Sequence, residues 1–479
     1  MSNTLPMKPP RTVAGLPVPL YSISGFTTFD AFAQYSAQAL VTYYIYFAVA
    51  DGGLALPTAQ TIAIISAWVA ISLLGTVFTA WLVDRVIGAG LGLRSGAIIS
   101  AVGYLVLAFV PGTVGLAVGL ILLTLAPALT LASEGTLASG VMEASPSRRE
   151  AGFAIFYLGS ALGAFIGFTV SGFLQEAWGF QIGFIASAVV ISVGYIVYLP
   201  SRRAVEANNP RPPADERPRG LALILPVTAA VVVTIGLAIM VSLGINPSTV
   251  ISIGTGVYVI AMFVRYFTSQ TFTRHERQGV ARYVPFFIAT IAWNLIFQQI
   301  YTTIAIYSDL RTDRFLFGLE LPAATVLGVA PLCVVVAAPI FAAVWAKLGE
   351  RQPSLAVKFA FTFACCGIAM GVLAASSLQS VTPILVLALL VLVFGVGDVV
   401  VSPSGMSLAT EIAPTANESR MLSLHYVGAS LGISLAGVAG DWFDSKNPSA
   451  YFGAFSAIAF AVALGMVIVR AGTGRRVTV

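Results

Sequence analysis

The sequence predicts an all-α polytopic membrane protein, and its composition and apolar patterning are the main observations that predict it. Of its 479 residues, 58% are hydrophobic and only 9% are charged, and the mean hydropathy is +0.91. Soluble domains carry roughly 25% charged residues. Apolar runs of about 20 residues, long enough to cross a bilayer as helices, recur along the chain. Because lipid admits only helices and closed barrels, and the alternation typical of barrel strands is absent, we predict helices.

Runs and breaks in the sequence predict fourteen transmembrane helices. Their expected ranges are 26–50, 57–83, 93–110, 113–142, 150–174, 180–200, 220–243, 246–267, 285–308, 321–346, 354–376, 381–412, 418–440 and 449–470. An even number of spans places both termini on the same side of the membrane.

The distribution of positive charge predicts which side that is. Of 25 Lys and Arg residues, only Arg311, Arg314 and Lys446 fall in loops on one side, and the other 22 (25 − 3) lie on the opposite side. The positive-inside rule therefore predicts a multi-pass protein of the cell membrane with both termini cytoplasmic. The Pro-rich residues 1–25 lack the apolar core of a signal peptide and are expected to be a cytosolic tail. The net charge of +5 reflects this topology, and we expect no nucleic-acid partner.

Two segments of the chain indicate an internal repeat. "YLGSALGAF" begins at Tyr157 and "YVGASLGIS" begins at Tyr426, an offset of 426 − 157 = 269 residues. Ser133 and Ser402 match at the same offset. Six spans need roughly 200 residues, so the offset implies extra material between two halves. Two such six-helix halves, with the substrate site between them, are typical of the major facilitator fold.

We therefore predict an arrangement of six, two and six helices. The expected divisions are a cytosolic N-terminal tail (1–25), an N-terminal six-helix bundle (26–200), a linker with two extra helices (201–284), a C-terminal six-helix bundle (285–470) and a cytosolic tail (471–479). Within the repeated segments, Gly159 and Gly163 match Gly428 and Gly432. Small residues at every fourth position let helices approach closely, either as static packing or as an interface that moves during gating.

The first predicted span is unusually polar. On a helix of about 100° per residue, one face carries a line of polar side chains. This line consists of Thr27, Asp30, Gln34, Gln38 and Thr42, with Tyr35 and Tyr46 at its edge. Such a stripe is expected to face a cavity or another helix, because hydrocarbon would leave it unsatisfied. We predict Gln34, Tyr35 and Gln38 as substrate contacts.

Further polar pairs at helical spacing lie on other spans. They are Asn294, Gln298 and Thr302 on the ninth span, Asp398 and Ser402 just before Pro403 on the twelfth, and Thr130 and Glu134 on the fourth. An ionised acid in the membrane is costly unless it is paired, so such residues are usually functional. The alternative is a neutral acid that only packs. We predict Asn294, Gln298, Asp398 and Ser402 as substrate contacts, and Asp30, Asp398 and Glu134 as proton carriers.

The segment "WLVDRVIG" places Asp84 and Arg85 at a turn between the second and third spans. We expect an ion pair or a helix cap that steadies the cytoplasmic side, with a solvated turn as the alternative. Pro403, inside the twelfth span, joins these residues and the four glycines as a predicted gating or structural element.

The sequence lacks the motifs of an ATP-hydrolysing site and of a metal site. No Lys follows a Gly, which excludes a Walker P-loop and ATP hydrolysis. Cys333, Cys365 and Cys366 lie in predicted spans without metal-ligand spacing and are expected to be packing residues. We expect no enzyme activity, no cofactor and no metal. Transport would be driven by a gradient, and the protein is expected to be a monomer.

At these motifs the sequence resembles the proton-dependent oligopeptide transporter family of the major facilitator superfamily. The resemblance spans about residues 20–470 and rests on "WLVDRVIG", "AGFAIFYLGSALGAF" and "DVVVSPSGMSLATEIAP". It implies the major facilitator fold, two extra helices between the halves, alternating access and proton-coupled peptide symport.

The residues that the family uses for function are largely replaced. The family's first helix reads E-x-x-E-R-F-x-Y-Y-x-x-R. In this chain Thr27 and Asp30 occupy its two Glu positions, and Ala31 and Gln38 occupy its two Arg positions. The resemblance further places Leu131 at the fourth-helix Lys, Ala161 at a fifth-helix Asn, Phe297 at a ninth-span Glu and Asp398 at a twelfth-span Glu.

The resemblance therefore implies a site without the cations that hold a peptide carboxylate but with the acid that holds its amino end. Loss of a preformed cationic pocket disfavours ordinary di- and tripeptides. We predict a proton-linked transporter of peptide-like or amine-bearing solutes, with protons, the solute and the lipid bilayer as its partners. An antiporter that exports a drug or peptide-like antibiotic and a transport-inactive receptor or scaffold are the alternatives.

Overall fold

The computed structural model describes residues 12–473 apart from 14, 143–147, 208, 210–219, most of 221–242, 270–271 and 412–417. The described chain divides into two compact units. Unit 1 contains the described residues of 1–37, 75–167 and 184–231, and unit 2 contains those of 38–74, 168–183 and 232–479. Helices α1 (Val18–Tyr46), α2 (Thr58–Leu82) and α5 (Arg149–Trp178) each contribute to both units.

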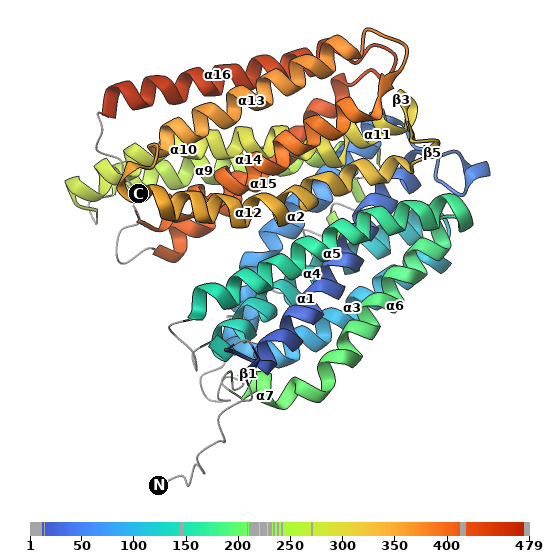
Figure 1. Ribbon diagram of the computed structural model, residues 1–479, viewed down its shortest axis with the longest axis horizontal. Helices are drawn as coiled ribbons and strands as arrows, with labels where there is room; N and C mark the ends of the chain where they lie inside the picture. Colours follow the sequence, from blue (N-terminus) through green and yellow to red (C-terminus); the bar gives the residue numbers. More distant parts are fainter. Residues whose placement is uncertain are drawn as a thin grey trace. The chain divides into compact units, whose positions relative to one another are not determined.

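Helices make up nearly all of the described structure (Figure 1). Besides α1, α2 and α5, the longer helices are α3 (Ala89–Phe109), α4 (Gly112–Met142), α6 (Phe180–Tyr198), α9 (Pro247–Thr268), α10 (Arg274–Phe297), α12 (Val329–Leu348), α13 (Leu355–Ser376), α14 (Ile384–Glu411), α15 (Glu418–Ala439) and α16 (Ser449–Thr473). The short α7 (Arg202–Glu206) and α11 (Thr303–Leu310) are the remaining α-helices whose bounds the structure describes. The chain is therefore all-α, as the composition predicts.

Twelve helices among the described residues are long and apolar enough to cross a membrane. Helix α1 is not among them, because its polar residues lower its hydropathy, although its 29 residues give a length of about 43 Å. The first predicted extra helix, 220–243, lies mostly outside the described residues. The second extra helix is α9, whose observed bounds differ by one residue from the predicted range of 246–267.

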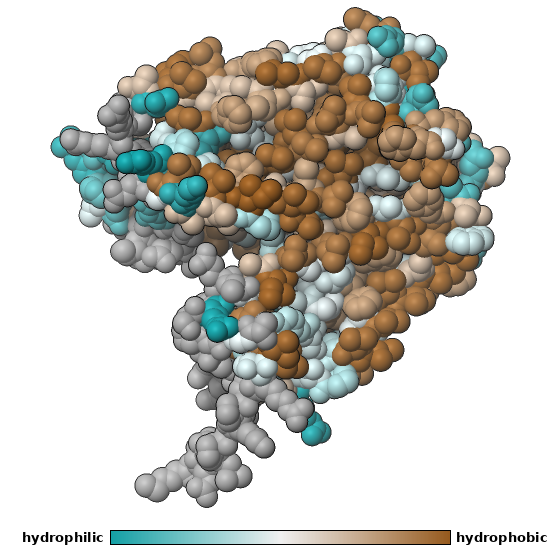
Figure 2. Space-filling model, viewed as in Figure 1, coloured by the Kyte–Doolittle hydropathy of each residue, from teal (hydrophilic) through white to brown (hydrophobic). Residues whose placement is uncertain are grey.

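Exposed hydrophobic side chains cover the outward faces of several helices (Figure 2). On α12 these are Leu332, Val336, Ile340 and Val344, and on α16 they include Leu464, Val467 and Ile468. The spacing of three or four residues places each set on one face of its helix. Contiguous apolar surface of this kind faces hydrocarbon in a membrane protein.

Two predicted helix starts are wrong. Helix α1 begins at Val18 rather than at residue 26, because Pro19 is tolerated in the first turn of a helix. Helix α10 begins at Arg274 rather than at 285. A capping box formed by Thr273 and Glu276 starts it, and Pro285 lies inside the helix instead of beginning it.

Glycines set the packing of α5 on α1 within unit 1. A Cβ atom at Gly159 would lie 2.8 Å from Thr28 Oγ1 and 3.1 Å from the carbonyl oxygen of Ser24. A Cβ atom at Gly163 would clash with the carbonyl oxygen of Thr28 itself. The two helices therefore approach closely enough to exclude any larger side chain, as small residues at every fourth position predict.

The matching glycines behave alike in unit 2, where α15 packs on α10. A Cβ atom at Gly428 would clash with the ring of Phe287, and one at Gly432 would clash with the carbonyl oxygen of Ile291 and lie 2.9 Å from Asn294 Cβ. Thus the segments matched at the offset of 269 residues make equivalent helix contacts. Both glycine pairs lie where two helices pack closely.

Helix α9, which matches the second predicted extra helix, packs on α15 in unit 2. Ser248 Oγ donates to the carbonyl oxygen of Ala63 (2.8 Å), Ser252 Oγ to Ser434 Oγ (2.9 Å), and the Asn246 amide contacts the Asp441 carboxylate (3.2 Å). These hydrogen bonds hold α9 in place. Helices α13 and α16 also lie side by side in this unit (Figure 1).

Strands are limited to three two-stranded pairs in the described chain. They are β1 (Thr12–Val13) with β2 (Leu16–Pro17), β3 (Thr312–Asp313) with β6 (Thr382–Pro383), and β4 (Phe315–Leu316) with β5 (Leu319–Glu320). In the β4–β5 hairpin Phe315 pairs with Glu320 and Leu316 with Leu319. Positive φ angles at Phe317 (52°) and Gly318 (83°) make its tight two-residue turn.

Candidate functional site

The polar stripe of α1 faces the protein interior. Thr27 is 3% exposed, Asp30 6%, Gln38 8% and Thr42 1%. Gln34 and Tyr35, between them along the helix, are half-buried. The helical spacing therefore correctly predicts that this line of residues avoids lipid. Asp30, Gln34 and Tyr35 belong to unit 1, whereas Gln38 and Thr42 belong to unit 2.

The two acids of unit 1 lie together between α1 and α4. Thr130 Oγ1 on α4 donates to Asp30 Oδ2 (2.9 Å). Thr27, one turn before Asp30, contacts Glu134, one turn after Thr130. Glu134 is 1% exposed, and its Oε1 has no hydrogen-bond partner. The structure thus brings together Asp30 and Glu134, two of the three residues that the sequence predicts as proton carriers.

The positions where the resemblance implies cations carry uncharged side chains in this chain. Ala31 is buried, and its Cβ lies against Gly163. Gln38 is buried and Leu131 is 56% exposed. In the part of the chain that the structure describes, no buried residue is a Lys or an Arg. A carboxylate of a bound solute would therefore find no buried guanidinium or ammonium group among these residues.

Asp398 is the centre of a polar cluster in unit 2. Trp293 Nε1 on α10 donates to Asp398 Oδ1 (3.2 Å), and Ser402 Oγ, one turn along α14, donates to the same oxygen. Trp293 stacks on Phe297, with ring centroids 5.5 Å apart. As a residue Asp398 is half-buried, whereas Asp30 and Glu134 are buried. Two donors hold one oxygen of Asp398, and its other oxygen has no donor among the described residues.

The predicted line of Asn294, Gln298 and Thr302 does not follow one continuous helix. Helix α10 ends at Phe297, a 3₁₀ turn η5 spans Gln298–Tyr301, and Thr302 has φ −123° and ψ −94° before α11 begins. Asn294 Nδ2 donates to the carbonyl oxygen of Thr290 (2.9 Å), and Gln298 is buried with an unpartnered Nε2. The prediction of a single helix over 285–308 is therefore wrong.

A network beside this break has no counterpart among the sequence predictions. Gln299 Oε1 accepts hydrogen bonds from Thr303 Oγ1 (2.7 Å) and from Tyr451 OH on α16 (2.9 Å). At the end of the 3₁₀ turn, Thr42 Oγ1 of α1 donates to the carbonyl oxygen of Tyr301 (3.3 Å). Discontinuous helices in transporters commonly lie at substrate or ion sites. The dipeptide Gln298–Gln299 in an apolar run is the sequence signal that identifies this region.

The remaining predicted gating residues are placed as follows. Asp84 and Arg85 lie in a π-helical turn, η2 (Val83–Ile87), and both are exposed. The ion pairs of the described residues include neither Asp84 nor Arg85. The expected pairing is therefore absent, and the exposed turn matches the solvated alternative. Pro403 lies inside α14, where it cannot donate to the carbonyl group of the preceding turn.

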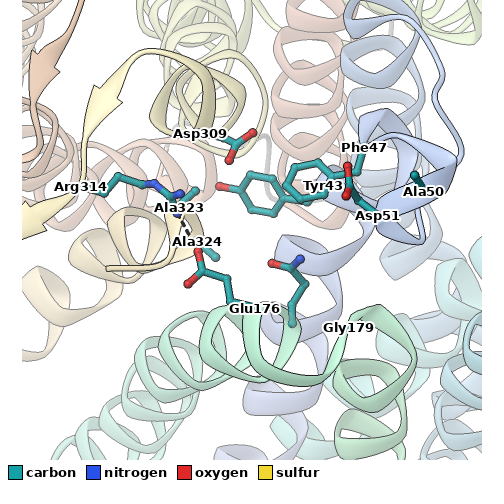
Figure 3. Close-up of a pocket in the computed structure, with 11 residues that line it drawn as sticks. Tyr43, Phe47, Ala50, Asp51, Glu176, Gly179, Asp309, Arg314, Ala323 and Ala324 are labelled. Carbon is teal, nitrogen blue, oxygen red and sulfur yellow. Dashed lines mark hydrogen bonds and ion pairs between the residues drawn. The ribbon is translucent and has the colours of Figure 1, made fainter. Parts of the chain in front are cut away.

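Unit 2 also contains a cavity of about 480 Å³. Figure 3 shows Asp309, Arg314 and Glu176 around it, with the rings of Tyr43 and Phe47 on one side. Arg314 pairs with Glu176 (2.7 Å) and with Glu320 (3.1 Å). From the sequence Arg314 is predicted only to lie in a loop, and its ion pairs with Glu176 and Glu320 are not predicted.

The Asp309 side of the cavity is held by tyrosines. Tyr46 OH donates to Asp309 Oδ2 (2.6 Å), and Tyr43 OH contacts the carbonyl oxygen of Ala305 (3.3 Å). Asp51 also lines the cavity. These bonds link α1 to α11 within unit 2. Among the described residues, no group of three or more His, Cys, Asp or Glu side chains is suitable for a metal ion.

Long apolar helices, buried polar side chains on their inner faces and a helix broken within a span define a polytopic membrane transporter. The POT family model matches residues 93–458. The chain therefore belongs to the POT family, and the relatives that it matches are transporters rather than enzymes.

Individual relatives match over almost the whole chain. The uncharacterized transporter YclF of Bacillus subtilis (strain 168) is 28% identical over 471 residues, which cover 96% of this chain and 94% of that protein. A di-/tripeptide transporter of Lactococcus lactis subsp. lactis (strain IL1403) is 29% identical over 484 residues, covering 97% of each. A crystal structure of peptide transporter POT in complex with sulfate matches with a TM-score of 0.90 and 28% identity, covering 98% of this chain and 97% of that one.

Proposed function

We propose that this protein is a proton-linked secondary transporter of peptide-like or amine-bearing small solutes. Membership of the POT family and its similarity to a di-/tripeptide transporter support transport of peptide-like compounds. The observation that carries the substrate class is the half-buried Asp398 combined with the absence of a buried Lys or Arg in the described chain. A carboxylate held by two donors on one oxygen has its other oxygen available for an ammonium group.

The three buried or half-buried acids have different proposed roles, according to their exposure. Asp398, which is half-buried, is the contact for the solute's amino group, with Ser402 and Trp293 positioning its carboxylate. Asp30 and Glu134, which are enclosed, carry the proton. Gln34, Tyr35, Gln38, Asn294 and Gln298 remain proposed solute contacts.

Replacing Asp398 should therefore affect binding according to the charge of the solute. We expect Asp398→Asn to weaken binding of dialanine amide, which keeps a free amine and lacks a carboxylate, by about 1.5–3 kcal/mol, the loss of a charge-assisted hydrogen bond. Binding of N-acetyl-dialanine amide, which has no charge, should change much less. Equilibrium binding to the purified protein measures both, with Asp444→Asn at an exposed position as the control. Equal losses for the two probes would make Asp398 a structural residue.

Binding of free dialanine, which has a carboxylate, tests whether the site lacks a cation that recognises this group. Without a buried guanidinium or ammonium partner for its carboxylate, dialanine should bind the wild-type protein no more tightly than dialanine amide. Binding of dialanine tenfold or more tightly than the amide would show that a cation recognises the carboxylate, and would overturn the proposed substrate class.

We also propose the predicted arrangement of two six-helix halves, 26–200 and 285–470, joined by two extra helices in the 201–284 linker, with both termini cytoplasmic. The equivalent glycine contacts of α5 on α1 and α15 on α10 support two repeated halves. Cysteines introduced at Arg148, in the 201–219 linker and at Arg475 should react with an impermeant maleimide only from the cytoplasmic side. A cysteine at Lys446 should react only from outside. Labelling of the linker from outside would contradict this topology.

A further inference from the structure

Asp30 and Glu134 are arranged reciprocally on two helices. Asp30 on α1 contacts Thr130 on α4, and Glu134 on α4 contacts Thr27 on α1. Each acid lies one helical turn from the threonine on its own helix, so the four side chains form a closed cluster between helices that run in opposite directions. All four residues are buried, with exposures of 6% or less.

Among the described residues, no positive charge balances this cluster. The ion pairs of the described residues include neither acid, and the charged and titratable groups that act on the cluster are the acids themselves and Tyr104 of α3. Tyr104 is itself 1% exposed. Two ionised carboxylates enclosed together without a cation would repel each other and would both lose their hydration. At least one proton therefore has to reside in the cluster while it is closed to water.

The threonines have hydrogen bonds that suit either protonation state. Thr130 Oγ1 donates to Asp30, but the carbonyl oxygen of Pro127 lies 3.0 Å away as an alternative acceptor. Thr27 Oγ1 has the same choice, because it lies 3.1 Å from the carbonyl oxygen of Ile23. Each hydroxyl is therefore able to donate to an ionised acid, or to accept from a protonated acid while donating to its own backbone.

One oxygen of the cluster is left without a partner. Glu134 Oε1 is buried and forms no hydrogen bond in the described structure. An unsatisfied carboxylate oxygen at this depth is costly, and binding a proton removes its charge.

We propose that Asp30 and Glu134 form a carboxyl pair that shares a single exchangeable proton between α1 and α4, so that the proton site of the transporter is the pair and not either acid alone. This proposal rests on the proposed function and specifies its proton site. Binding forms one O–H bond on one carboxyl group. Release breaks that bond and transfers the proton to water once the cluster is open to solvent, leaving two carboxylates that water and the threonine hydroxyl groups hydrogen-bond.

The pair is tested by infrared titration of the full-length protein in lipid vesicles without any solute. The carbonyl stretch of protonated carboxyl groups is followed with pH in the wild type, Asp30→Asn, Glu134→Gln, the double variant and the control Asp444→Asn. Two interacting acids titrate in two separated steps. Measured as the difference from the double variant, which keeps the other carboxyl groups of the chain, we expect both steps in the wild type and the control, and one step in each single variant, at a pH between the two wild-type steps.

The alternatives give different spectra. Independent acids would each leave the other's step at its wild-type pH, and two packing residues would give no pH-dependent difference between the wild type and the double variant. Either outcome would overturn the proposal. Each single variant tests the proposal separately. If one of them fails to fold, the other still provides the test. The proposed function is judged separately by transport: a titrating pair in a protein that moves no protons with solute would refute the function and retain the pair.

Discussion

Asp30→Asn is expected to abolish pH-driven accumulation of solute while leaving exchange of bound solute largely intact. Asparagine keeps the shape of the side chain and its contact with Thr130, but it is neutral at every pH and cannot bind and release a proton. Exchange across the membrane needs only the movement of the loaded carrier. Accumulation needs a proton that binds on one side and leaves on the other.

The measurement compares counterflow of dialanine amide with its uptake under an imposed pH gradient in reconstituted vesicles. The expected result is counterflow near the wild-type rate and accumulation reduced to the equilibrium level. Asp444→Asn should resemble the wild type in both assays. Accumulation at the wild-type level in Asp30→Asn would show that Asp30 only packs and that coupling lies elsewhere.

Gly163→Ala is expected to destabilise the protein by about 1–3 kcal/mol, the usual cost of an added methyl group in a packed interior. The new Cβ atom would meet the carbonyl oxygen of Thr28, which is backbone and cannot rotate away, so α5 and α1 would have to separate. Gly135→Ala on α4 is the matched control, because no neighbouring atom lies within 4 Å of its Cβ position.

Thermal unfolding of the two variants in detergent, followed by fluorescence-detected chromatography, gives the comparison. The midpoint should fall for Gly163→Ala and should stay unchanged or rise for Gly135→Ala, since alanine favours helix more than glycine. An unchanged midpoint in Gly163→Ala would show that the helices do not pack as closely as the structure has them.

The sequence predicts features that depend on periodicity. The buried stripe on α1 and the helix ranges of α4, α13 and α15 follow from apolar and polar spacing, which the membrane environment makes easy to interpret. The glycine contacts of α5 are predictable for the same reason. The pairing of Asp30 with Glu134 is not, because the spacing of residues on one helix does not determine which helix packs against it.

Helix ends and breaks depend on local hydrogen bonds that apolar spacing does not reveal. The polar residues from Arg274 to Arg282 extend α10 because the cap at Thr273 satisfies its first turn. The break at Thr302 is stabilised by contacts from Thr42 and by the Gln299 network, which join residues far apart in the sequence. The same holds for Arg314 and Glu176, which lie 138 residues apart.

Proton movement coupled to solute movement is the central claim, and it is measured by adding dialanine amide outside vesicles that contain the wild-type protein and a trapped pH indicator. With the membrane potential clamped and no initial pH gradient, inward transport of the solute should acidify the interior, and the signal should be lost in Asp30→Asn. Solute uptake at a normal rate with no change in internal pH would contradict the proposed function.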